Sequence, residues 1–389
     1  MPGHRLELAD VFRTHQRDFL NRWNSALSIE QRRALRNLRD CRTAALGGHL
    51  QQCDRCGHRV ISYNSCRNRH CPKCQASARA KWLAQRQAEL LPVPYFHVVF
   101  TLPQELAHLA LQNPKQIYNI LFRAASETLL TIAADPQHLG ASIGFLAVLH
   151  TWGQNLHLHP HLHCVVPGGG ISPDGSRWIA CRKNFFLPVR VLSRLFRKRF
   201  LKALRSAFRH GTLHFAGDLR YLAAPSAFRS LCQKAADREW VVYAKPPFGG
   251  PERVLKYLAR YTHRVAISNP RLRSLENGNV RFEWKDYAHG NQTKDMILDA
   301  VEFIRRFLLH VLPSGFVRIR QFGLLANRVR KQKLEQCRAL LAACQPSIDC
   351  QDSSEVSSDD PHRCPVCTFG RLIVIELLVA QPTAVQDTS

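Results

Sequence analysis

Two closely spaced pairs of cysteines are the strongest chemical signal in this sequence. Cys53 and Cys56 form one C-x2-C pair, and Cys71 and Cys74 form another, with fourteen residues between the pairs. Four thiolates at this spacing can surround one zinc ion tetrahedrally, and Gly57 permits the tight turn that follows the first pair. A closed four-thiolate site has no open position for a substrate, so we interpret it as structural zinc.

Further cysteines and histidines leave the ligand set open. Five lie close to the two pairs and could replace a ligand or form a second site: Cys41, His49, His58, Cys66 and His70. For each one alone packing is the simpler interpretation, because a buried cysteine behaves as a small apolar residue. A separate pair near the C-terminus, Cys364 and Cys367, is a weaker zinc candidate. Its irregularly spaced potential partners are Cys337, Cys344 and Cys350.

A run of alternating histidines is the second group of possible metal ligands. It reads HLHPHLH, with the imidazoles at His157, His159, His161 and His163. Alternate residues of a strand share one face, so two imidazoles can hold one divalent ion, Mg²⁺ or Mn²⁺, and leave it open to a substrate oxygen. Pro160 interrupts the run, which makes His161 and His163 the cleaner pair. A third ligand is needed, and His159, Gln154 or His157 could supply it.

Two tyrosines form the third feature. Tyr257 and Tyr261 lie in the string ERVLKYLARYTHRV and would share one face of a helix, one turn apart. Their neighbours are basic or imidazole side chains: Lys256, Arg260, His263 and Arg264. Such neighbours favour a phenolate and attract phosphate. Without them, two tyrosines at helical spacing would be read as core aromatics.

The overall composition indicates a polyanionic partner. The chain has 389 residues, with 55 Lys and Arg against 29 Asp and Glu, which gives a formal net charge of +26. Residues 346–389 hold seven acidic and two basic residues, a net charge of −5, so residues 1–345 carry +31. This positive charge repels itself unless a partner such as nucleic acid neutralises it. We therefore expect the basic part of the chain to bind DNA.

The apolar patterning predicts the elements that must position these residues. Helical spacing extends over 8–40, 76–91, 104–134, 188–209, 251–263 and 294–311. Strands are predicted at 95–101, 142–151, 162–166, 266–268 and 280–284, and 316–343 runs from a short strand into a basic helix. Residues 346–361 are typical of a flexible acidic linker. Strands mixed with helices, without a regular β-α-β alternation, predict an α+β fold with an antiparallel core sheet.

Several strings, taken in order, resemble those of a known family, the rolling-circle insertion-sequence transposases of the IS91-like type. The family's N-terminal zinc-binding module resembles CRTAALGGHLQQCDRCG and SYNSCRNRHCPKCQ. Its His-hydrophobic-His nuclease motif resembles HPHLHCVVPGGG, and its tyrosine segment resembles KPPFGGPERVLKYLARYTHRVAISN. A downstream block resembles FVRIRQFGLLANR. The resemblance covers about residues 10–330 and leaves the acidic C-terminal segment outside it.

The resemblance implies a fold and a site. It implies an HUH-nuclease-like core, in which helices flank a central antiparallel sheet, preceded by a helical zinc-binding module. His161 and His163 would be the metal ligands, and Tyr257 and Tyr261 the nucleophiles, although family members with one active tyrosine also exist. The implied division is a zinc-binding and DNA-binding module (1–91), an HUH-type tyrosine transposase domain (92–330) and a segment with a basic helix, an acidic linker and a cysteine pair (331–389).

The implied activity is cleavage and rejoining of single-stranded DNA. One tyrosine would form a covalent 5′-phosphotyrosine, which a 3′-hydroxyl later attacks to seal a new junction. A single strand can bend into such a site, so single-stranded element ends and target are the expected partners. Two alternatives remain. A non-catalytic zinc-containing nucleic-acid-binding protein leaves the histidines and tyrosines without a role, and a metal hydrolase without a covalent intermediate leaves the tyrosines unexplained.

The sequence also carries an expectation about location. Residues 1–10 lack the apolar core of a signal peptide, and no apolar run reaches the ~18 residues that a membrane-spanning helix needs. The chain has fourteen cysteines, which fit a reducing compartment where thiolates bind metal. We expect a cytoplasmic protein of the bacterial cell interior, associated with the nucleoid and without a membrane partner.

Overall fold

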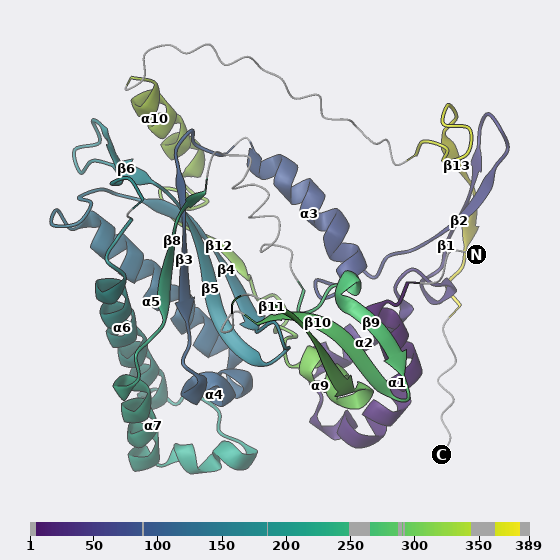
Figure 1. Ribbon diagram of the computed structural model, residues 1–389, viewed down its shortest axis with the longest axis horizontal. Helices are drawn as coiled ribbons and strands as arrows, with labels where there is room; N and C mark the ends of the chain where they lie inside the picture. The colour runs from purple at the N-terminus through teal and green to yellow at the C-terminus, as the bar shows by residue number, and fades with distance from the viewer. Residues whose placement is uncertain are drawn as a thin grey trace.

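The computed structural model describes residues 5–343 and 362–381, apart from 88, 185, 249–264, 287–289 and 291. Helices and antiparallel sheets are mixed in it, which confirms the predicted α+β class (Figure 1). Short 3-10 helices connect several elements and span Asn24–Ala26, Ala44–Leu46, Gln104–Leu106, Gly217–Ala223 and Asn269–Arg271. Within the described ranges, no helix is long and apolar enough to cross a membrane.

A five-stranded sheet forms the centre of the molecule. In spatial order its strands are β12 (Ile319–Gly323), β4 (Gly144–Trp152), β5 (Leu158–Pro167), β3 (Tyr95–Thr101) and β8 (Val242–Phe248). Each neighbouring pair is antiparallel. Strand β4 is buried along its whole length. Strand β3 consists mainly of β-branched and aromatic residues, which are well suited to a covered sheet.

Helices cover one face of the central sheet (Figure 1). They are α4 (Ala107–Gln112), α5 (Pro114–Ala134), α6 (Val189–Arg209) and α7 (Pro225–Asp237). Alternate strand residues such as Phe100, Phe145 and Leu162 enter the apolar core on this side. Phe100 meets Phe196 of α6 edge to face, with 4.9 Å between the ring centroids. Because these residues alternate with the histidines of β5, the packing turns the histidines toward the other face.

The other face of the sheet has an apolar half and a polar half. Leu146 and Val165 belong to the apolar half. Helix α10 (Arg330–Ala342) covers it through Leu334, and helix α3 (Pro72–Gln87) adds Trp82 at its border. The histidines occupy the polar half, which these two helices leave accessible.

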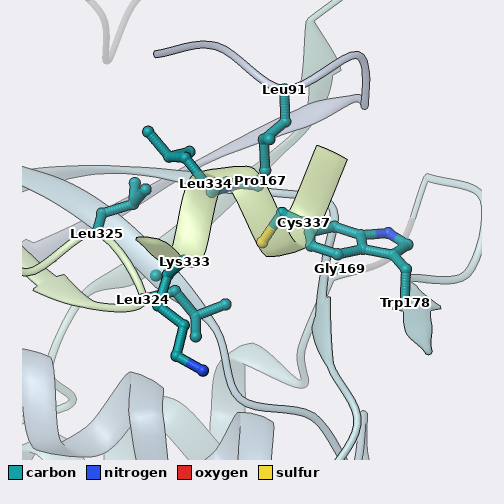
Figure 2. A pocket seen from close by; sticks show the side chains of 10 residues that line it. Leu91, Pro167, Gly169, Trp178, Leu324, Leu325, Lys333, Leu334 and Cys337 are labelled. Atoms are coloured by element: carbon teal, nitrogen blue, oxygen red, sulfur yellow. The ribbon is translucent and has the colours of Figure 1, made fainter. Parts of the chain in front are cut away.

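The contact of α10 also explains one cysteine. Figure 2 shows Cys337 with Leu334, Leu91 and Trp178 around a pocket of about 10 Å³. Trp178 belongs to the small hairpin of β6 (Gly169–Ile171) and β7 (Trp178–Ala180). Cys337 is buried in this apolar cluster, so it packs there and is not a partner of the Cys364 pair.

A second core joins the N-terminus to residues far along the chain. It combines α1 (Leu8–Trp23) and α2 (Ile29–Asp40) with β9 (Leu272–Glu276), β10 (Asn279–Asp286), β11 (Gln292–Asp299) and α9 (Ala300–Leu308). Phe12 and Phe307 meet in it edge to face, with ring centroids 5.5 Å apart. The division expected at residue 91 therefore separates elements that share one hydrophobic core.

Two predicted helices differ from the structure because of local polar contacts. The helix expected over 8–40 is interrupted before Ser28, whose hydroxyl accepts a hydrogen bond from Gln31 N and starts α2. The helix expected over 294–311 begins only at Ala300, where Asp299 caps it by accepting from Glu302 N. The preceding residues pair with β10 as strand β11 instead.

A small sheet brings the end of the chain back to its beginning. Strand β1 (Gly48–Cys53) lies between β2 (Arg59–Tyr63) and β13 (Leu372–Leu378). We call residues 362–381 the C-terminal tail, which lies beside the β1–β2 hairpin in Figure 1. The predicted linker over 346–361 lies outside the described residues.

Candidate active site

Three imidazoles converge on the polar half of the central sheet. His161 and His163 lie two residues apart on β5, and His150 lies directly opposite His161 on β4. One ring nitrogen from each lies within 4.8 Å of the others, and the Nε2 atoms of His161 and His163 are 3.0 Å apart. We call these three residues the histidine centre. Its spacing suits three nitrogen ligands around one divalent ion.

Hydrogen bonds orient two of these rings. His161 Nδ1 lies 2.6 Å from the carbonyl oxygen of His159 and donates to it, which leaves Nε2 as the acceptor nitrogen. The Nδ1 of His163 is 2.8 Å from Nε2 of His97, so a protonated Nδ1 donates to His97 and again leaves Nε2 to face the centre. Burial, together with Lys245 and His161, lowers the pKa of His97 to about 3. His97 is therefore neutral and able to accept this hydrogen bond at physiological pH.

The third member of the centre is not one of the residues that the sequence suggested. His159, Gln154 and His157 were the expected candidates, and none of them belongs to the group of converging nitrogens. The ladder between β4 and β5 shifts register between His150 and Trp152, and His159 lies in the stretch of β5 between their partners, His161 and Leu158. His157 is engaged elsewhere, 3.1 Å from Arg306 Nη1. A histidine in the neighbouring predicted strand was the available signal, but the cross-strand register was needed to interpret it.

The histidine centre opens into a cleft of about 700 Å³. Lys245 of β8 and Lys285 of β10 line it and supply positive charge. Trp284 and Trp152 add aromatic surface, and Trp152 stacks on His150 with the ring centroids 4.7 Å apart. Trp152 is buried, whereas Trp284 is partly exposed, and cations beside such a ring suit a phosphate backbone with unpaired bases.

One arginine connects the cleft wall to two neighbouring segments. Arg271 donates to the carbonyl oxygen of Gln154 in the loop between β4 and β5. It also donates to the carbonyl oxygen of Glu283 on β10 at 2.8 Å, and to that of Ala266 at 3.4 Å. Residues 265–268 are the first described residues after 249–264. The chain therefore returns beside the cleft immediately after the tyrosine segment.

The tyrosine segment itself lies outside the described residues. This applies to both predicted nucleophiles and to the predicted DNA-binding residues: Tyr257, Tyr261, Lys256, Arg260, His263 and Arg264. Another tyrosine is described on the same face of the sheet. Tyr243 of β8 lies opposite Val99, which lies opposite His163, and 48% of Tyr243 is exposed.

The cysteines form two clusters, and the predicted zinc quartet is divided between them. The inner cysteine cluster comprises Cys41, Cys66, Cys71 and Cys74. The tail cysteine cluster comprises Cys53, Cys56, Cys364 and Cys367. The prediction of one site built from both N-terminal pairs is therefore wrong. The reason is the β1–β2 hairpin, because Cys53 and Cys56 lie at its tip and Cys71 and Cys74 lie beyond its base. A five-residue strand is about 17 Å long, so β2 holds the two pairs too far apart to share one ion.

The inner cysteine cluster is compact and close to the second core. Cys74 Sγ is 3.6 Å from Cys41 Sγ and 3.6 Å from Cys66 Sγ, and Cys71 Sγ is 3.5 Å from Cys41 Sγ. Hydrogen bonds from Cys66 and Cys71 lower the pKa of Cys41 to about 2, which favours its thiolate. Three of the four residues are buried, so this cluster is closed to substrate.

Buried polar contacts connect the loop of the inner cysteine cluster to the histidine centre. Arg318 Nη2 donates to Gln75 Oε1 at 3.0 Å. The carbonyl oxygen of Arg318 accepts a hydrogen bond from the backbone N of Leu149, the residue before His150. In the loop before α3, Arg69 Nη1 donates to the carbonyl oxygen of Phe316 at 2.6 Å. Residues 316–318 thus connect the segment around the inner cysteine cluster to β4, the strand that carries His150.

Comparisons with known proteins find transposase relatives of the chain. The family model described as "Transposase zinc-binding domain" matches residues 11–102, and one described as "Putative transposase" matches residues 144–333. A "Putative transposase y4qJ" of Sinorhizobium fredii is 56% identical over 98% of both chains. The "Transposase for insertion sequence element IS801" of Pseudomonas savastanoi pv. phaseolicola is 28% identical over 84% of this chain and 79% of its own length. No solved structure matches the chain significantly.

Cysteine clusters that could hold zinc, a basic cleft and three converging histidines on an antiparallel sheet are features of a DNA-processing class of protein. The chain belongs to the IS91-like family of insertion-sequence transposases. DNA binding follows from this membership, and the zinc-binding family model is consistent with structural zinc in the N-terminal part of the chain.

Proposed function

We propose that this transposase is a metal-dependent tyrosine enzyme that cuts and rejoins single-stranded DNA in rolling-circle-type transposition. The observation that carries the proposal is the convergence of His150, His161 and His163 at the floor of an open basic cleft. Its substrate is the DNA of the cell, so we expect it to act at the nucleoid.

The three imidazoles are suited to hold Mg²⁺ or Mn²⁺. They supply three neutral nitrogen donors on one side, and the cleft leaves the opposite side open to a phosphate oxygen. Nitrogen donors are softer than carboxylates, so we expect Mn²⁺ to support the reaction at lower concentration than Mg²⁺. The bound ion would withdraw charge from a non-bridging oxygen of the scissile phosphate.

Tyr257 and Tyr261 are the proposed nucleophiles. In the cleavage step the tyrosine Oη–phosphorus bond forms and the phosphorus–O3′ bond breaks, while the tyrosine hydroxyl loses its proton and the leaving O3′ gains one to become a 3′-hydroxyl. The phosphoester is conserved in the protein–DNA adduct, so a later 3′-hydroxyl can reverse the exchange without ATP. Lys256, Arg260, His263 and Arg264 are proposed to hold the DNA backbone beside these tyrosines.

Features of the cleft support a single-stranded substrate. Trp284 is partly exposed and lines the cleft, so an unpaired base can stack on it. Lys245 and Lys285 stand within the same cleft and can neutralise phosphates. An unpaired strand can bend enough to bring one phosphate to the histidine centre.

The test is a denaturing gel of the full chain with end-labelled single-stranded DNA from the terminus of its own element, with Mn²⁺, Mg²⁺ or EDTA. We expect a protease-sensitive covalent band that requires metal and is lost in Tyr257→Phe or Tyr261→Phe. Tyr243→Phe is the matched control, because Tyr243 shares the face of the histidine centre. Loss of the adduct in that variant alone would assign the nucleophile to Tyr243 and overturn the proposal.

The same assay separates the alternatives. Cleavage without an adduct would favour a metal hydrolase. DNA binding without any cleavage, on the correct DNA and with either metal, would favour a non-catalytic zinc-containing nucleic-acid-binding protein, which the net charge of +26 and the two cysteine clusters also fit.

A further inference from the structure

The tail cysteine cluster is built from two turns with equivalent backbone hydrogen bonds. In the hairpin, Cys53 N donates to the carbonyl oxygen of His58 at 2.9 Å, and Gly57 N donates to that of Cys53 at 3.2 Å. In the tail, Cys364 N donates to the carbonyl oxygen of Gly370 at 2.8 Å, and Thr368 N donates to that of Cys364 at 3.1 Å. The residue four positions after the first cysteine has a positive φ in both turns, 71° at Gly57 and 60° at Thr368.

The sulfur atoms of these two turns have the spacing of a metal site. Cys53 Sγ is 3.6 Å from Cys367 Sγ, and Cys56 Sγ is 3.7 Å from Cys364 Sγ. Four thiolates around one zinc at 2.3 Å each are separated by about 3.8 Å, whereas a disulfide requires about 2 Å. Backbone amides also point at two of the sulfurs: Arg55 N donates to Cys53 Sγ at 3.4 Å and Gly370 N to Cys367 Sγ at 3.3 Å.

The small sheet around this cluster has almost no hydrophobic core of its own. No residue of β1, β2 or β13 belongs to any of the three apolar clusters found in the described part of the chain. Ile373, Val374 and Leu377 of β13 are 51%, 54% and 79% exposed. Strand pairing alone gives such a sheet little stability, and small modules without a core commonly depend on a metal.

We propose that Cys53, Cys56, Cys364 and Cys367 bind one zinc ion, which fastens the C-terminal tail to the N-terminal hairpin as a clasp separate from the inner cysteine cluster. The pairing of Cys53 with Leu372 and of Gly48 with Leu378 continues this attachment along β1. Asp54 adds a cross-link between the two turns: its Oδ1 accepts from Arg371 N at 2.8 Å, and its N donates to the carbonyl oxygen of Arg371 at 3.0 Å.

The proposed zinc site can be tested by measuring the zinc content of the chain. We expect the full chain, purified under reducing conditions with zinc, to lose one zinc per chain in the double variant Cys364→Ser and Cys367→Ser, as measured by elemental mass spectrometry. Cys181→Ser is the control, because Cys181 is partly exposed and belongs to neither cluster. Unchanged zinc content in the double variant, with full zinc occupancy in the wild type, would overturn the inference.

A second variant tests the same site with every cysteine retained. A Cβ atom on Gly370 would lie 2.4 Å from Cys53 Sγ, so Gly370→Val should also remove one zinc per chain. Phe369→Ala is the neighbouring control, since Phe369 is 86% exposed, and it should leave the zinc content unchanged. Retention of all zinc in Gly370→Val would contradict the proposed geometry.

The attachment of the tail can be measured directly. A protease site placed within 346–361 allows the chain to be cut between the body and the tail, and size-exclusion chromatography then shows whether the tail stays bound. We expect it to co-elute in zinc and to be released at least about tenfold more after zinc chelation or in Cys53→Ser with Cys56→Ser. A tail that stays bound after its zinc is removed would show that strand pairing holds it and would overturn the clasp. These tests do not depend on DNA cleavage, so they stand apart from the proposed function.

Discussion

The inner cysteine cluster and the histidine centre differ in their exposure to substrate. The inner cluster has four sulfur ligands, three of them on buried residues, and it adjoins the second core. The histidine centre has three imidazole nitrogens, the proposed ligands of the catalytic ion, on the floor of a cleft of about 700 Å³. A closed set of four ligands can organise the chain, whereas three ligands beside a cleft leave room for a phosphate. We therefore expect substitutions at the inner cysteine cluster to lower stability, and substitutions at the histidine centre to lower the rate of cleavage.

The largest effect is expected at the inner cysteine cluster. Replacing Cys41 and Cys74 with serine should lower the free energy of unfolding by about 4 kcal/mol or more, because it removes a metal site beside the core. DNA binding and cleavage should then decline together. Chemical denaturation and a DNA-binding assay measure this, with Cys181→Ser as the control. Loss of cleavage with unchanged stability would erase the distinction between the two sites.

The histidine centre should show the opposite pattern. His161→Ala should reduce the rate of DNA cleavage about 10³-fold, because a ligand of the proposed catalytic ion is lost, while DNA binding and Tm change little. His159→Ala is the matched control, since His159 lies two residues away on the same strand and outside the centre. If His159→Ala proved as damaging as His161→Ala, His150 would not be the third ligand.

A smaller effect is expected at His97, which positions His163 through the 2.8 Å contact between their rings. His97→Ala should weaken the apparent affinity for Mn²⁺ about 10- to 100-fold. Saturating Mn²⁺ should restore most of the cleavage rate, and His97→Gln, which keeps an acceptor, should lose less. A metal titration of the cleavage rate checks this. A loss that persists at saturating metal would mean that His97 acts on the DNA.

The effect that is smallest at neutral pH concerns acid stability near the cleft. Burial lowers the pKa of His310 to about 4, while its Nε2 donates to the carbonyl oxygen of Leu156. In the unfolded chain the His310 imidazole binds a proton below about pH 6.5, whereas in the folded chain it stays neutral down to about pH 4. The free energy of unfolding therefore falls by about 1.4 kcal/mol for each pH unit as the pH is lowered from about 6.5 to about 4. His310→Gln should reduce this slope by one proton in urea titrations at several pH values. An unchanged slope would assign the acid sensitivity to other groups.

The sequence determined the features that depend on local spacing. Alternation along a strand puts His161 and His163 on one face, and a C-x2-C spacing brings two thiols into one turn. The α+β class also followed from local patterning, since β-branched runs and helical spacing are properties of short segments. The net charge of +26 is likewise a property of composition.

Only the tertiary structure decided which distant residues meet. His150 joins the histidine centre because the register of β4 against β5 places it opposite His161, and one residue of slip would turn it to the other face. The two N-terminal cysteine pairs belong to different clusters because the β1–β2 hairpin separates them. The pairing of β13 with β1 places Cys364 and Cys367 at the tip of this hairpin, beside Cys53 and Cys56. Covalent geometry determines which residues meet when they are only a few positions apart. Strand register, and the pairing of a C-terminal strand with an N-terminal one, depend on packing that local spacing does not encode.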